Sequence, residues 1–236
     1  MKTIKLLLVM LLSIVVVACG GGGESSGGNT GGSNTSGTAA QYLTKNAVGN
    51  MWTHLETGVL AITGQPTSTS RGTQVDTITA NAGGVVTFTH TYTPAGGTAS
   101  PSSTYTEKID ATGALVSSDG IHPPVVVLPA TFSIGTAWTA VPADSATGTS
   151  AHTATITAFN VTRIVPAGIF TDCLQINATW TETTAGVTRT ANYVGYFSPS
   201  AGTPVEYIYD FSSTSGGIIT NDTVTNKLQA GYISNP

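Results

Sequence analysis

Hydrophobic positions from Gln41 onward alternate with threonine and other small polar residues, and turn residues recur at short intervals. A period of two residues is typical of a β-strand with one buried face, whereas an amphipathic helix repeats every 3.6 residues. The clearest example predicts a strand over residues 86–92. Its predicted buried face consists of Val86, Phe88, His90 and Tyr92, and its other face of Thr87, Thr89 and Thr91.

Other segments show the same alternation. Residues 104–109 and 114–117 flank the sequence Asp110-Ala111-Thr112-Gly113, which predicts a hairpin turn. Further strands are predicted over residues 170–180, 188–197, 205–211 and 218–228. Because no segment shows a convincing helical period, we predict an all-β fold, an antiparallel and strongly curved sheet or half-barrel.

A short motif occurs twice in the chain. Gly49-Asn50-Met51-Trp52-Thr53 matches Gly135-Thr136-Ala137-Trp138-Thr139, and Thr77-Ile78-Thr79-Ala80 recurs as Thr155-Ile156-Thr157-Ala158. We expect each glycine to form the turn into a strand and each tryptophan to anchor the core. The pattern suggests an internal duplication with a boundary near residues 120–130.

The segment between the two copies is rich in proline. Pro123 and Pro124 precede an apolar run, and Pro129 follows it. Because proline cannot donate a hydrogen bond to a β-ladder, we predict an extended connector that covers one mouth of the sheet rather than a paired strand.

The N-terminus has the pattern of an export signal. Lys2 and Lys5 precede an apolar run that is too short to span a bilayer as a permanent helix. Val16-Val17-Ala18-Cys19 resembles the lipobox of bacterial lipoproteins, with Val16 in place of the commoner leucine. The resemblance implies that Cys19 receives a diacylglycerol thioether and that the signal, residues 1–18, is removed. Gly20, rather than aspartate, is compatible with sorting to the outer membrane in that family.

Composition narrows the function classes. Residues 20–38 are nearly all Gly, Ser, Asn and Thr, which predicts a flexible tether after Cys19 and a single all-β domain over residues 39–236. Charged residues make up only 8% of the chain, the formal net charge is −4, and removing Lys2 and Lys5 lowers it further. No basic patch is left for nucleic acid.

Candidate catalytic and metal-binding motifs are weak. The Gly-x-Ser-x-Gly pattern at residues 23–27 lies in the tether rather than at a strand-to-helix turn, and His54-Leu55-Glu56 has no paired cysteine ligands. Asp110 and Asp119 are interpreted as turn formers, and Cys173 as a buried structural thiol. We therefore expect no catalytic residues, no metal and no cofactor.

An aromatic stripe provides the candidate binding residues. Three interpretations remain open: the rings fill the core, line a cavity for an acyl chain or hydrophobic peptide, or form an outer platform for a sugar or polymer. The residues of the stripe are Tyr193, Tyr196, Phe197, Tyr207, Tyr209 and Phe211.

Four blocks of the chain resemble a family of bacterial envelope lipoproteins. They are residues 48–53, 128–139, 166–174 and 193–202, the third reading Pro-Ala-Gly-x-Phe-x-Asp-Cys-Leu; Ser200-Ala201-Gly202-Thr203 departs from the family pattern. The resemblance implies a curved antiparallel sheet similar to the outer-membrane lipoprotein carrier fold, and no catalytic residues. We expect a lipid-anchored protein of the cell envelope, in the outer membrane, that binds a lipid, a hydrophobic peptide or a protein partner. The alternative is a structural or adhesive surface module without a small ligand.

Overall fold

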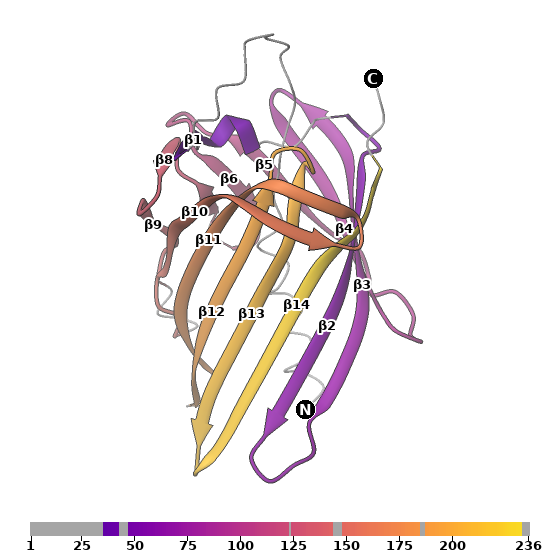
Figure 1. The fold of residues 1–236 in the computed structure, drawn as a ribbon, viewed down its shortest axis with the longest axis vertical. Coiled ribbons are helices and arrows are strands. Elements are labelled where there is room, and N and C mark those ends of the chain that lie inside the picture. Colours follow the sequence, from indigo (N-terminus) through magenta and orange to yellow (C-terminus); the bar gives the residue numbers. More distant parts are fainter. Residues whose placement is uncertain (1–34, 43–46, 123, 144–147, 185–186, 233–236) are drawn as a thin grey trace.

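A computed structural model describes residues 35–42, 47–122, 124–143, 148–184 and 187–232. The predictions for the signal, Cys19, most of the tether and the pattern at residues 23–27 lie outside these ranges. Figure 1 shows the described chain as long, tilted strands that curve around a common interior.

Twelve strands form one antiparallel sheet that is nearly closed and barrel-shaped, which confirms the predicted fold class. Their order is β7-β6-β5-β4-β3-β2-β14-β13-β12-β11-β10-β9. The strands of this sheet are β2 (Met51–Ile62), β3 (Ser68–Ala82), β4 (Val85–Pro94), β5 (Ser103–Ile109), β6 (Leu115–Ser118), β7 (Val125–Leu128), β9 (Ala137–Val141), β10 (His152–Val165), β11 (Gly168–Thr184), β12 (Val187–Ser198), β13 (Thr203–Ser215) and β14 (Ile218–Tyr232). A separate pair, β1 (Ser36–Thr38) and β8 (Thr131–Ser133), lies with the 3₁₀ helix η1 (Ala39–Tyr42) at one end of the barrel (Figure 1).

The strand order divides into two meanders, β2–β7 and β9–β14. The first strand of each meander lies beside the last strand of the other, which gives two junctions. At the first junction, β2 and β14 pair through a long antiparallel ladder. At the second, which we call the seam, the indole Nε1 of Trp138 in β9 donates a hydrogen bond to the carbonyl of Val126 in β7 over 2.8 Å.

Both meanders begin with the same turn. Gly49 and Gly135 have φ values of 95° and 85°, a region that L-residues with a Cβ rarely adopt, so both positions require glycine. The amide of Gly49 donates to the carbonyl of Ile78, and the amide of Gly135 donates to that of Ile156, each over 2.8 Å. A register shift follows each isoleucine, at Ile78/Ala80 and at Ile156/Ala158. The repeated motifs of the sequence therefore form equivalent structures.

The end of the β10–β11 hairpin folds back across the outer face of the barrel. Three register shifts lie between Ile156 and Arg163, and Asn160 adopts a φ of 55° at the bend. Residues 161–172, which we call the strap, then cross in front of β12, β13 and β14 (Figure 1). The amide of Ala167 donates to the carbonyl of Leu228 in β14 over 3.1 Å, which fixes the strap's tip.

The prediction that residues 121–129 form an unpaired connector is wrong. Val125–Leu128 form the edge strand β7, which pairs with β6. The prolines do not prevent this pairing because they flank the strand, and every residue within it retains its N–H. The predicted hairpin at residues 110–113 is confirmed, since the amide of Asp110 donates to the carbonyl of Ala114 between β5 and β6.

Candidate functional site

A cluster of polar and ionisable side chains occupies the interior face of β2–β5, where a core would normally be apolar. Buried positions alternate with more exposed ones along each of these strands, and these residues occupy the buried positions. We call this group the polar cluster. Its members, all less than 10% exposed, are His54, Glu56, Gln74, Asp76, His90, Tyr105 and Glu107.

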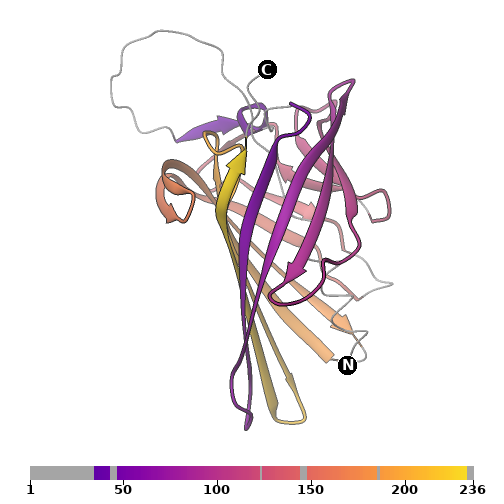
Figure 2. The same ribbon diagram turned by 90° about the vertical axis from the view of Figure 1, so that its right-hand side faces the viewer.

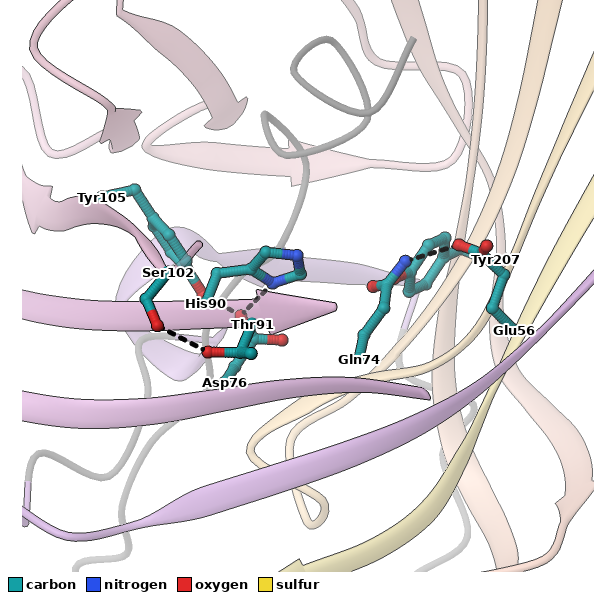
Figure 3. Close-up of polar contacts among 8 residues, drawn as sticks. All are labelled: Glu56, Gln74, Asp76, His90, Thr91, Ser102, Tyr105 and Tyr207. Atoms are coloured by element: carbon teal, nitrogen blue, oxygen red, sulfur yellow. Dashed lines mark hydrogen bonds and ion pairs between the residues drawn. The ribbon is translucent and has the colours of Figure 1, made fainter. Parts of the chain in front are cut away.

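Asp76 joins strands β3, β4 and β5 within this cluster (Figure 3). Its Oδ1 lies 2.9 Å from Nδ1 of His90 and accepts a hydrogen bond of 3.4 Å from the hydroxyl of Tyr105. Burial alone would lower the pKa of His90, but the hydrogen bond and charge of Asp76, with a contribution from Glu56, outweigh it and raise the pKa. Protonation of the imidazole would therefore give a buried ion pair between the two side chains.

A second chain of hydrogen bonds crosses the interior from β2 to β13. Nε2 of Gln74 donates to Oε2 of Glu56 over 2.7 Å, and the hydroxyl of Tyr207 donates to Oε1 of Gln74 over 2.6 Å (Figure 3). Burial raises the pKa of Glu56, although the hydrogen bond from Gln74 opposes the shift. Gln74 therefore connects the polar cluster to the aromatic residues on the opposite side.

His54 has a different environment from His90. Its Nε2 lies 2.8 Å from the carbonyl of Pro204, so this nitrogen must carry the proton. Burial lowers the pKa of His54, despite the opposing charge of Asp76. His54 is therefore a neutral imidazole, and its Nδ1 has no partner among the described residues.

Glu107 is completely buried, and neither of its carboxyl oxygens has a hydrogen-bond partner within the described ranges. Burial, followed by the negative charge of Asp76, raises the pKa of Glu107 well above its usual value. The interior therefore favours the uncharged carboxylic acid form of Glu107. Each buried polar group left unpaired costs about 1–3 kcal/mol, so this side of the interior reduces the stability of the barrel.

The chemistry available to the cluster is limited by its enclosure. Asp76 and His90 have the geometry in which a carboxylate orients an imidazole, but the side chain of His90 is only 9% exposed. In the described part of the chain, no group of three or more His, Cys, Asp or Glu residues is arranged to hold a metal ion. Alternation on single strands indicated the inward position of His90, whereas the meeting of Asp76, Tyr105 and Glu107 depends on pairing between strands.

The aromatic stripe divides between the two faces of the sheet. Tyr196 lies on the outer face, where the Arg163 guanidinium of the strap sits 4.1 Å from its ring centroid. The other five side chains are at most 5% exposed in the interior: Tyr193, Phe197, Tyr207, Tyr209 and Phe211. Tyr209 is central among these rings: it contacts Tyr193, Tyr207, Phe211 and Trp180, and its centroid lies 5.0 Å from that of Tyr193.

Ion pairs and hydrogen bonds of polar side chains hold the strap against the barrel. Glu206 of β13 is 2% exposed and forms ion pairs with Arg163 of the strap and, over 3.2 Å, with Lys227 of β14. Asp172 accepts hydrogen bonds from the Ser198 hydroxyl and the Ser200 amide. The pairing of Arg163 with Glu206 across 43 residues is not readable from local sequence.

Cys173, at the inner end of the strap, is a buried free thiol, as predicted. Burial, with the neighbouring charge of Asp172, raises its pKa to about 12. A thiol with this pKa is a poor nucleophile at neutral pH.

The turn-forming roles of two aspartates are also confirmed. Oδ1 of Asp110 accepts hydrogen bonds from the amides of Thr112 and Ala114, and Oδ1 of Asp119 accepts from those of Ile121 and His122. A surface depression of about 530 Å³ lies beside β1 and β8, and Gln41 and Phe132 contribute to its lining. Within the described ranges, no helix has the length and hydrophobicity needed to cross a membrane.

Comparisons with known proteins reveal similarity only at the level of three-dimensional structure. No family model and no curated protein matches the chain. One similar structure is a Bacteroides fragilis protein described as exported and as having a YMCC-like fold; it has 12% identity and a TM-score of 0.45, with 80% of this chain and 97% of that chain covered. Another is a Parabacteroides distasonis protein described as a lipoprotein, with 14% identity, a TM-score of 0.42, and coverage of 79% and 96%. Likeness at this level identifies neither a family nor a function, and the family resemblance of the sequence remains a prediction.

Proposed function

We propose that this chain is a lipid-anchored, non-catalytic protein of the cell envelope that binds a partner through the outside of its barrel. The anchor rests on Val16-Val17-Ala18-Cys19, a lipobox-like sequence placed directly after an export signal. Attachment through the acyl chains of Cys19, with placement in the outer membrane, is part of the proposal.

The filled interior carries the argument for outside binding. The five inward side chains of the aromatic stripe belong to one buried cluster that also contains Trp180, and each is nearly excluded from solvent. A carrier for an acyl chain would need a cavity of several hundred Å³ beside these rings. By contrast, large apolar side chains are exposed in three places: Ile134 lies between β8 and β9, Ile164 and Ile169 lie on the strap, and Ile218 and Ile219 begin β14.

The proposed absence of catalysis rests on the placement of the ionisable side chains. Asp76, His90 and Glu107 converge inside the barrel rather than in a cleft. A substrate would have to displace packed core residues before it reached them, whereas catalytic groups lie in pockets open to substrate.

One observation favours the alternative of a structural or adhesive surface module. Rows of short polar side chains cross the outer face of the sheet, with little charge among them. One row joins neighbouring strands through the pairs Thr153–Thr179, Thr179–Asn192, Asn192–Asp210 and Asp210–Thr223. Such a face could adhere to a polar polymer through many weak hydrogen bonds.

Two measurements on the full-length protein test the proposal. Cys19→Ala should abolish acyl labelling and leave the protein soluble or as an uncleaved precursor, while the wild type fractionates with envelope membranes. Native mass spectrometry of the mature chain should give an apo mass that does not change when fatty acids or phospholipids are added. A labelled, fully processed Cys19→Ala protein would contradict the anchor, and a stoichiometric lipid adduct in the interior would contradict outside binding.

A further inference from the structure

The strap exposes an apolar pair that its own fold does not use. Ile164 and Ile169 are cross-strand partners next to the hairpin tip, and they are 71% and 68% exposed. Their neighbours point the other way: Val165 is buried at 6% exposure in an apolar core cluster, and Phe170 packs against the same cluster. The strap therefore has an inner apolar face that completes the core and an outer apolar face that is open to solvent.

This outer face carries no free charge. Arg163 is the only cationic residue of the strap, and its guanidinium turns inward to Glu206 and the ring of Tyr196. Asp172 is held by Ser198 and Ser200. The exposed positions around Ile164 and Ile169 are Thr162, Pro166, Ala167 and Thr171. Transfer of this tip into an apolar or interfacial environment would therefore not require burial of an ion.

The strap is also held in a defined position. The ion pair between Arg163 and Glu206 and the hydrogen bond from Ala167 to Leu228 attach it to β13 and β14. A fixed apolar hairpin loses less conformational entropy on docking than a mobile loop does.

The position of the lipid anchor indicates what the outer face of the strap meets. Thr35, the first described residue, accepts a hydrogen bond from the amide of Ile134 beside β1. Figure 1 and Figure 2 both show β1 and the strap toward the same end of the barrel, with the β13–β14 turn at the opposite end. Fifteen residues, 20–34, separate Cys19 from Thr35, and a chain of this length reaches at most about 55 Å.

The limited length of the tether favours membrane contact at the end of the barrel that carries the strap. A 15-residue strand such as β14 is about 50 Å long, so the opposite end touches the membrane only if the tether is almost fully extended. The strap can reach the same membrane with a short, unstretched tether. The effective concentration of the bilayer is therefore far higher at the strap than at the β13–β14 turn.

We propose that Ile164 and Ile169 insert into the interfacial region of the bilayer that holds the Cys19 acyl chains, so that the strap forms a second membrane contact. This inference rests on the proposed lipid anchor. The contact is apolar and independent of anionic lipid, because the strap presents no unpaired cation. It orients the barrel with the exposed Ile218 and Ile219 directed away from the membrane, where a partner can reach them.

Depth-dependent fluorescence quenching tests the contact. The full-length lipidated protein, in a Cys173→Ala background, carries Ile169→Cys labelled with an environment-sensitive fluorophore and is reconstituted into phosphatidylcholine vesicles. Some of these vesicles contain a lipid with a nitroxide near the headgroup. Because an interfacial segment lies about 5–10 Å deep, we expect about twofold quenching at position 169. Quenching should be equal at low and high salt.

The matched control places the same fluorophore at the other end of the barrel through Ile218→Cys. Little quenching at position 218 supports the proposed orientation, and equal or stronger quenching at position 218 overturns it. A blue-shifted probe at position 169 that lipid does not quench overturns the membrane contact and indicates that the strap contacts a second copy of this chain.

Flotation of the vesicles separates failure of the inference from failure of the proposed function. A protein that floats with the vesicles but is not quenched at position 169 retains its anchor and overturns only the strap contact. A protein that has no acyl mass on Cys19 and does not float overturns both. A second test uses the double variant Ile164→Ser with Ile169→Ser. On vesicles, amide hydrogen exchange in the strap should be faster in this variant than in the wild type. In the unlipidated Cys19→Ala protein, free in solution, the same two substitutions should leave exchange in the strap unchanged.

Discussion

The two meanders of the barrel fill the same interior in opposite ways. β2–β5 contribute buried ionisable groups such as Asp76, His90 and Glu107, whereas β11–β13 contribute stacked aromatic rings. The matching tryptophans of the two meanders have different cross-strand partners: Trp52 pairs with Asp76, whereas Trp138 pairs with Ala154. The comparison shows that the repeated turn and strand pairing do not depend on the chemistry of the inward side chains.

The two halves therefore differ in what a substitution should cost. Aromatic packing depends on shape and volume, and its loss leaves a cavity. A buried polar network depends on complete pairing, and removing one partner leaves the other unsatisfied. The following predictions separate these two cases, from the largest expected effect to the smallest.

Phe197→Ala should cause the largest loss in the aromatic half. Phe197 is 1% exposed and lies among the interior rings, so truncation should lower the free energy of unfolding by about 3–5 kcal/mol. Urea denaturation followed by circular dichroism measures the change. Phe197→Leu is the matched control and should cost less than about 1.5 kcal/mol. A loss below that control value for Phe197→Ala would mean that the rings do not form a packed core.

Asp76→Ala should destabilise the polar half by about 3 kcal/mol, because it leaves the buried His90 and the hydroxyl of Tyr105 without an acceptor. The informative comparison is the double variant Asp76→Val with His90→Leu, which replaces the pair with apolar side chains. It should recover at least half of the lost stability in the same denaturation experiment. A double variant less stable than Asp76→Ala would show that this half also depends on shape.

Glu107→Gln should change how stability depends on pH. The folded chain keeps a proton on Glu107 at a pH where the unfolded chain, with a pKa of about 4.3, has lost it. The stability that Glu107 contributes is therefore present below that pH and is lost as the pH rises. The variant lacks this loss, so its advantage in stability over the wild type should grow as the pH rises from 4 to 7. Parallel stability curves for the two proteins would contradict a buried neutral acid.

Trp138→Phe should have the smallest effect, about 1 kcal/mol, because it removes one hydrogen bond and retains most of the ring. Its consequence is local: amide hydrogen exchange in β7 and β9 should become faster at the seam. Trp52→Phe removes the indole hydrogen bond of the matching tryptophan, which runs to the carbonyl of Ala201 between β12 and β13 rather than across a junction. Exchange at the β2–β14 junction should stay slow because backbone hydrogen bonds hold it. Equal acceleration at both junctions would show that the seam is no weaker than the paired junction.

Much of the fold was predictable because local rules govern it. A period of two placed Val86, Phe88 and His90 on one inward face of β4, and Asp110 with Gly113 identified a hairpin. The prediction for residues 125–128 was wrong because it did not consider that Pro124 and Pro129 lie outside the strand. In an edge strand only the N–H groups that face the neighbouring strand must donate, so prolines at its ends do not prevent pairing.

The candidate site was less predictable than the fold. The aromatic stripe was identified, yet sequence left open whether its rings fill the core, line a cavity or face outward. Tyr196 differs from Tyr193 and Phe197 because it lies at an even position of β12, whereas the odd positions of this strand face the interior. The polar cluster was missed as a unit, because Glu56, Asp76 and Glu107 lie on separate strands and none has a distinctive local motif.

The sequence by itself determined the β-strands, the turns that require glycine, the repeated entry motif and the lipobox-like signal, since each depends on residues close together in the chain. Only the tertiary structure decided which face of the sheet each ring occupies, where the buried carboxyls meet, and that the strap folds over β12–β14. These features depend on strand register and on contacts such as Arg163 with Glu206, and a shift of one residue would reverse every side chain of a strand.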